Sequence, residues 1–151
     1  MSRALSIAAV LGLFACGRDH VLQEGRYGLA VAGVIRDDCQ LAADPEVTRS
    51  ADLVLAGDTL SLDYSLFAMH LVGAYLKGVE RFAVDGSAAN VVTPVRSQQC
   101  LLDLVTTHLE AATRDPTHFD GNLAVKLEAQ KEACQCELWV SYAAAFAAAQ
   151  P

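Results

Sequence analysis

The sequence predicts an all-β domain in which an antiparallel meander of about eight short strands forms a sandwich or a small barrel. Hydrophobic and polar residues alternate with a period of two in several segments, which is typical of half-buried strands. Turn-forming residues separate these segments at short intervals, which favours hairpins over a parallel α/β arrangement. The 151 residues are 53% hydrophobic and 19% charged, which indicates one folded domain rather than a disordered chain.

The N-terminal segment has the pattern of an export signal. Arg3 supplies a positive charge, and residues 4–15 carry none. This apolar run predicts a signal helix that is too short to span a bilayer, which needs about 20 residues. The run leads into Leu13-Phe14-Ala15-Cys16, which resembles the lipobox of bacterial lipoproteins, although Phe14 departs from the small or β-branched residue common at that position. A plain secretory signal, or a buried first helix of a cytosolic domain, would give a similar pattern.

The resemblance to lipoproteins implies a membrane anchor and a division of the chain. Residues 1–15 would be the signal peptide, Cys16 the lipidated residue, 16–24 a tether, and 25–151 a single disulfide-stapled domain. Acyl chains such as palmitate would hold Cys16 at a lipid bilayer, because two or more chains anchor a protein where one barely does. Gly17, rather than Asp, follows the cysteine, and this implies the outer rather than the inner membrane of the cell envelope.

The strands are predicted from the period of two and the turns between them. The clearest alternating segments are 25–36, 60–64, 118–129 and 134–142. Turns are expected at 56–58, 77–78, 85–87 and 114–116, and longer connections at 40–51 and 86–99. Residues 66–76 fit a helix as well as a strand. The alanine-rich end, 143–149, has high helix propensity and predicts either a short C-terminal helix or an unravelled tail.

The remaining cysteines predict a disulfide framework. They are Cys39, Cys100, Cys134 and Cys136. An even number in an exported domain indicates two disulfides. Cys134 and Cys136 would share one face of a strand, and a bond between them would close a strained ring, so each is expected to pair with one of the other two. A metal site at this pair with His108 or His118 is not favoured, because the spacing lacks a paired C-x₂-C signature.

The charge balance excludes one class of partner. Lys and Arg number 11 and Asp and Glu number 18, so the formal net charge is -7. Such a chain gains nothing from a phosphate backbone, and we expect no nucleic-acid partner.

The candidate binding surface contains Trp139 and His118. Trp139 lies opposite the cysteine face of its strand, so it is either an exposed aromatic residue or packs under the alanine-rich end. His118 belongs to the polar cluster 115–120, which is foremost a turn with Asp-Pro at its start. His70 is expected in the core or at an edge, and His108 on a solvated face.

These features predict a membrane-tethered envelope protein with a binding or structural role. We expect no catalytic site, no cofactor and no metal. Its partners would be the bilayer and an unidentified envelope protein or small ligand. One alternative is a small-ligand carrier, because Gly25-Arg26-Tyr27 resembles the G-x-W opening of lipocalins with tyrosine in place of tryptophan. Such a carrier would need an apolar cavity inside the barrel. Another alternative is a secreted hydrolase or metal-binding protein that depends on His118.

Overall fold

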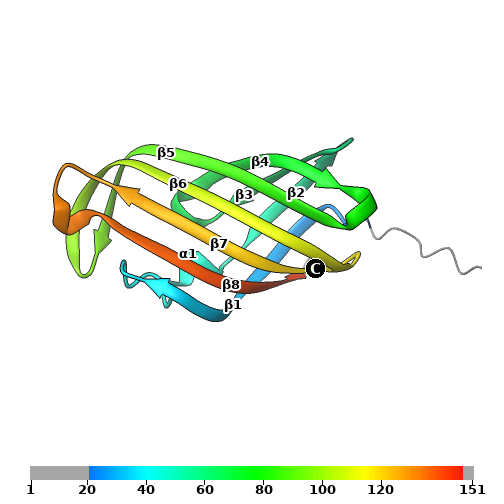
Figure 1. Cartoon of the computed structure of the whole chain (residues 1–151), viewed down its shortest axis with the longest axis horizontal. Coiled ribbons are helices and arrows are strands. Elements are labelled where there is room, and N and C mark those ends of the chain that lie inside the picture. The colour runs from blue at the N-terminus through cyan, green and yellow to red at the C-terminus, as the bar shows by residue number, and fades with distance from the viewer. Residues whose placement is uncertain (1–20, 148–151) are drawn as a thin grey trace, which may run out of the picture.

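The computed structural model describes residues 21–147, so the predicted signal helix and Cys16 lie outside the described residues. Eight antiparallel strands form one closed barrel (Figure 1), in which each strand pairs with the next along the chain and the last pairs with the first. The strands are β1 (Gly25–Asp37), β2 (Ala51–Ala56), β3 (Thr59–Tyr64), β4 (Met69–Leu76), β5 (Arg81–Val95), β6 (Gln98–Asp115), β7 (His118–Glu128) and β8 (Cys136–Phe146). The predicted all-β meander is confirmed, and its form is the barrel.

Helices are short in the described part of the chain. They are α1 (Pro45–Thr48) and the 3₁₀ turns η1 (Leu66–Ala68), η2 (Lys77–Val79) and η3 (Glu132–Cys134). Neither the helix nor the unravelled tail expected over 143–149 is observed for residues 143–146, which continue β8 between β1 and β7. Alanine favours a helix locally, but here two neighbouring strands bond the backbone and Ala144 is buried. Within residues 21–147, no helix is long and apolar enough to cross a membrane.

β5 and β6 form a long hairpin where the sequence predicts short strands. Its turn is the pair Arg96-Ser97, both with positive φ. The connection expected over 86–99 and the turn expected over 85–87 are therefore wrong. Gly86 lies within β5, where a Cβ atom would come within 2.4 Å of the Leu71 side chain and 2.7 Å of the His70 carbonyl oxygen. Glycine here permits a close approach inside the barrel wall rather than a turn.

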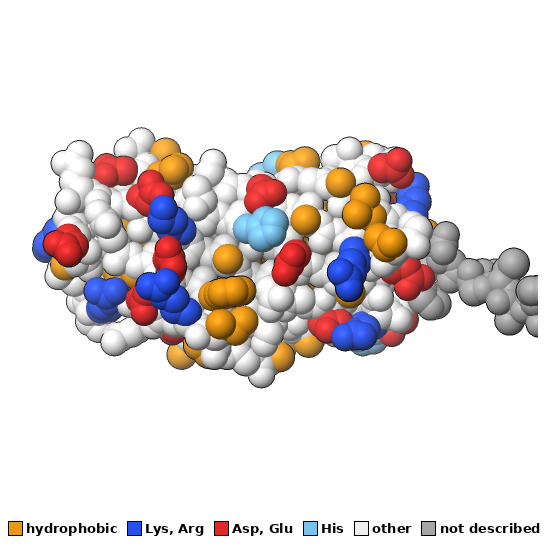
Figure 2. Space-filling view, viewed as in Figure 1, with side chains coloured by type: hydrophobic (Ala, Val, Ile, Leu, Met, Phe, Trp, Pro, Cys, Tyr) orange, Lys and Arg blue, Asp and Glu red, His pale blue; other side chains and the backbone are white. Residues whose placement is uncertain are grey.

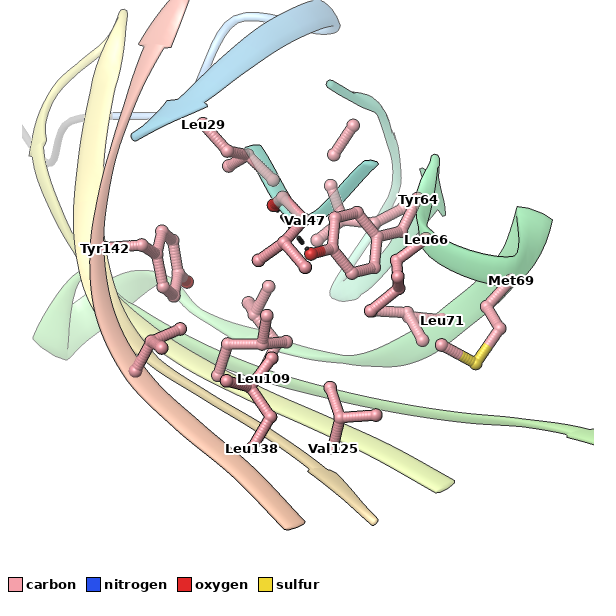
Figure 3. Packing of buried hydrophobic residues seen from close by; sticks show 14 of the residues in the cluster. Leu29, Val47, Tyr64, Leu66, Met69, Leu71, Leu109, Val125, Leu138 and Tyr142 are labelled. Carbon is pink, nitrogen blue, oxygen red and sulfur yellow. Dashed lines mark hydrogen bonds between the residues drawn. The ribbon is translucent and has the colours of Figure 1, made fainter. Parts of the chain in front are cut away.

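The inward-facing residues of the strands fill the barrel. The predicted inward faces of 60–64, 118–129 and 134–142 are confirmed by their burial. Leucine, valine and tyrosine side chains from many strands meet in the interior (Figure 3). The Phe119 ring lies 5.0 Å from Tyr27 and 5.1 Å from Phe82. Burial of each large apolar side chain contributes roughly 1.5–3 kcal/mol.

One predicted inward residue faces solvent instead. The period of two in residues 25–36 places Ile35 on the same face as Tyr27 and Leu29, but Ile35 is 54% exposed. The pairing of β1 with β8 shifts register twice between Val31 and Arg36. Such bulges add residues to one strand and turn the following side chains to the other face, which the alternation pattern alone does not reveal.

A loop and two disulfides complete the barrel wall. β1 pairs with β2 only from Gly25 to Tyr27, whereas it follows β8 almost to its end. The segment 38–50 packs beside this short seam and buries Val47, whose carbonyl accepts a 2.8 Å hydrogen bond from the Tyr64 hydroxyl (Figure 3). The Cys39–Cys136 disulfide joins this segment to β8.

The second disulfide, Cys100–Cys134, joins β6 to the connection between β7 and β8. The prediction of two disulfides is confirmed, including the expectation that Cys134 and Cys136 take separate partners. All four cysteines of the two disulfides are buried.

The described chain begins at the barrel end that also holds its C-terminal residue, Ala147 (Figure 1). Leu22 is buried there, and the Gln23 amide donates a 2.7 Å hydrogen bond to the Pro116 carbonyl in the turn between β6 and β7. The last residues of the predicted tether, 16–24, therefore pack on the barrel.

Candidate ligand-binding groove

A groove of about 700 Å³ crosses the outer face of β5, β6, β7 and β8 and reaches Arg36 on β1. This volume lies within the roughly 300–1,000 Å³ of typical small-molecule sites. The long strands run across the near side of Figure 1, and Figure 2 shows the same side with hydrophobic side chains between groups of charged ones. This groove is the best candidate site in the described residues.

Strand register brings the groove residues together. Side chains two residues apart share a face of a strand, and cross-strand partners lie about 4.5–5.5 Å apart. One transverse row contains Asp85, His108, Ala124, Trp139 and Arg36, each the register partner of the next. The neighbouring row contains Ser87, Thr106, Lys126 and Glu137. Five strands, β1 and β5 to β8, therefore contribute to one surface.

Trp139 forms the aromatic wall of the groove. It is 47% exposed, so the expectation that it packs under the alanine-rich end is wrong. The alternative, an exposed aromatic residue, is the one observed. Ala124 lies between Trp139 and His108 in the row, and its small side chain gives the groove a low floor between two rings.

The charged groups of the groove are paired with one another or with their neighbours. Arg36 lies 2.5 Å from Glu137 and 2.6 Å from Asp38, and the hydrogen bond and charge of Asp38 are the main cause of its raised pKa. Lys126 lies 2.7 Å from Glu128, whose hydrogen bond and charge likewise raise the lysine pKa.

His108 completes this pattern, because its Nδ1 atom lies 2.7 Å from the Asp85 carboxylate. Both side chains are exposed. The prediction that His108 lies on a solvated face is confirmed. Asp85 was missed by the sequence analysis, because Asp-Gly was interpreted as a turn. The available signal was the alternation of a strand: residues 82 and 84 are apolar, whereas residues 85 and 87 are polar.

The structure separates the two predicted binding-surface residues. His118 pairs with Ala145 on β8, six residues beyond Trp139, a separation of about 20 Å along the strand. Its Nδ1 atom lies 2.9 Å from both oxygens of Asp115. Hydrogen bonds from His118 and Thr117 lower the pKa of Asp115 to about 2. His118 thus begins β7 directly after the β6–β7 turn, and its imidazole pairs with Asp115 at the end of β6.

His70 is exposed rather than buried. It lies on the outer face of β4, with Nδ1 2.7 Å from the Asp63 carboxylate on β3. The expectation that His70 lies in the core or at an edge is wrong: β4 is paired on both sides in the closed barrel, and the buried residues Met69 and Leu71 alternate with His70, which faces outward.

The groove lacks the geometry of two common hydrolytic sites. Asp85 and Glu137 lie three strand spacings apart, about 14 Å, whereas paired glycosidase carboxyl groups lie roughly 5–9.5 Å apart. Among residues 21–147, no hydrogen bond joins His108 to the nearby Ser87 hydroxyl. Nor does this part of the chain gather three His, Cys, Asp or Glu side chains that could hold a metal ion.

Buried side chains occupy the barrel interior. Its largest fully buried side chains are aromatic residues and leucines, among them Tyr27, Tyr75 and Phe119. A ligand carried inside the barrel would have to displace them.

No protein-family model, curated protein or solved structure matches the chain.

Proposed function

We propose that this protein is a lipid-anchored protein of the cell envelope that binds a ligand in the groove over β5–β8. The observation that carries the binding role is the half-exposed Trp139 in a groove of ligand size. An exposed tryptophan among polar groups is typical of binding surfaces, because it offers a large rigid contact area at little entropic cost.

The proposed anchor is supported by Leu13-Phe14-Ala15-Cys16 and by the two disulfides. Structural disulfides persist in oxidising compartments such as the bacterial periplasm and are rare in the cytosol. Removal of residues 1–15 would take away Arg3 and change the net charge from -7 to -8. Such a body is not drawn onto anionic headgroups, so the acyl chains alone would hold it at the membrane.

The arrangement of the barrel fits this proposal. The described chain begins at the end beside the β6–β7 turn, whereas the groove runs over the side of the barrel. An anchor at that end would leave the groove open to the envelope space.

The anchor is tested by the intact mass of full-length protein extracted from membranes. We expect a chain that begins at Cys16 and carries acyl chains, and a Cys16→Ser variant that remains an unprocessed precursor. A Cys16→Ser protein that is cleaved and released like the parent would refute the anchor.

The groove is tested by tryptophan fluorescence, because Trp139 is the only tryptophan of the chain. Purified protein would be titrated with envelope fractions: polysaccharide, phospholipid vesicles and small-molecule extract. We expect a saturable change with one fraction, weakened by His108→Ala and retained by Val79→Ala, a change at an exposed residue outside the groove. The absence of a saturable change with every fraction would refute a binding role for the groove.

A further inference from the structure

We propose that the groove binds an uncharged carbohydrate chain, with one sugar ring stacked on Trp139. This inference rests on the proposed function and names the ligand class of the same groove. Three properties of the groove support it: its aromatic wall, its internally paired charges and its open shape.

The aromatic wall fits the chemistry of a sugar ring. One face of a pyranose presents C–H groups, and its edge carries hydroxyl groups. The exposed indole of Trp139 offers a flat surface for the C–H face, where dispersion contacts are collectively strong. Beside it, Thr106, Ser87 and the carboxylate of Asp85 line the same groove and can exchange hydrogen bonds with hydroxyl groups at the ring edge.

The charge arrangement disfavours an ionic ligand. The positive groups Arg36 and Lys126 and the negative groups Asp85 and Glu137 leave no formal net charge in the groove, although the whole chain carries -7. Arg36 is held by two carboxylates, and Lys126 by Glu128. Phosphate recognition uses Arg or Lys groups whose hydrogen bonds are available to the anion. A ligand with many hydroxyl groups and no charge fits such a surface.

The composition of the groove also distinguishes a glycan from a protein partner. The centres of protein–protein interfaces are depleted in charged residues, whereas Asp85 and Lys126 lie within the groove itself. Exposed Val34 and Ile35 lie next to Arg36 in the chain, so a second copy of this chain is the competing occupant that the experiment must separate. The groove also crosses four strands without closing over, which suits a chain longer than the site.

The experiment titrates full-length protein with four neutral hexasaccharides: cellohexaose, chitohexaose, mannohexaose and maltohexaose. We expect a saturable change in Trp139 fluorescence with at least one of them, and an affinity that changes little with added salt, since screening acts on charges. By calorimetry, Trp139→Ala should lose about tenfold or more in affinity, Trp139→Phe should lose less, and Val79→Ala should bind like the parent. Oligogalacturonate and inorganic phosphate serve as anionic probes and should bind more weakly.

The outcomes separate this inference from the proposed function. If an envelope fraction changes the fluorescence but none of the four hexasaccharides does, the carbohydrate inference fails and the binding role stands. If neither acts, both fail. Tighter binding of an anionic probe would overturn the inference, and so would a fluorescence change that follows protein concentration alone and coincides with a dimer in analytical ultracentrifugation.

Discussion

Removal of the Cys39–Cys136 disulfide should cost more stability than removal of Cys100–Cys134. The bridges close loops with sequence separations of 97 and 34 residues. In the chain-entropy model these lengths correspond to about 4.7 and 3.8 kcal/mol at 25 °C. The loops are nested: Cys100–Cys134, the inner bridge, lies within the loop that Cys39–Cys136, the outer bridge, closes. The inner bridge therefore shortens the path that the outer bridge closes. With the inner bridge in place, the outer bridge should still contribute about 4.3 kcal/mol to stability.

The assay is urea unfolding followed by far-ultraviolet circular dichroism on two double variants, Cys39→Ala/Cys136→Ala and Cys100→Ala/Cys134→Ala. With an m-value of about 2 kcal/mol/M, the outer variant should lose about 2 M in its unfolding midpoint, and the inner variant slightly less. The parent protein reduced with dithiothreitol is the control and should be less stable than either variant. If the inner bridge proves the more costly to remove, or each costs under about 1 kcal/mol, loop closure does not account for their effect.

Three further predictions concern the core, a strand glycine and a turn. Phe119→Ala should lower the free energy of unfolding by about 3–5 kcal/mol, because the ring is fully buried among other aromatic rings; a loss below 1 kcal/mol in a urea titration would contradict this packing. Gly86→Ala should destabilise the barrel, because its Cβ atom would meet the His70 backbone carbonyl as well as the Leu71 side chain, whereas Gly78→Ala, with nothing within 4 Å, should be neutral when both variants are compared by thermal unfolding; equal melting temperatures would contradict this. Asp115 should contribute stability above its ordinary pKa of 3.8 that is lost as the pH falls towards its folded value of about 2, since a carboxylate with a lowered folded pKa favours the folded state only when ionised; acid unfolding of Asp115→Asn should lack this component, and an unchanged profile would count against it.

The strand pattern was predictable where one face of the barrel is buried and the other solvated. In residues 118–129 every second side chain faces the core, so the alternation in the sequence reports the structure directly. The end of β8 was not predictable in this way. Ala143 and Ala145 carry a local helix preference, and only the presence of β1 and β7 on either side makes the strand the better state.

The candidate site was only partly predictable, because strand register assembles it. The sequence indicates that Trp139 is a binding residue if its face is outward, but it does not show which residues of other strands lie opposite. Asp85 and His108 lie on β5 and β6, which pair with each other. β6 pairs in turn with β7, and β7 with β8, and these registers place the two residues in one row with Trp139. His118, chosen for its polar neighbours in sequence, lies outside the row for the same reason.

The short ladder between β1 and β2 determines where the closed barrel opens most easily. Only Gly25 to Tyr27 join the two strands, whereas β5 and β6 are bonded along nearly their whole length. Spontaneous opening that costs less than global unfolding should therefore begin at this seam. In deuterated water, the amides of β2 and of the segment 38–50 should exchange before those of β6.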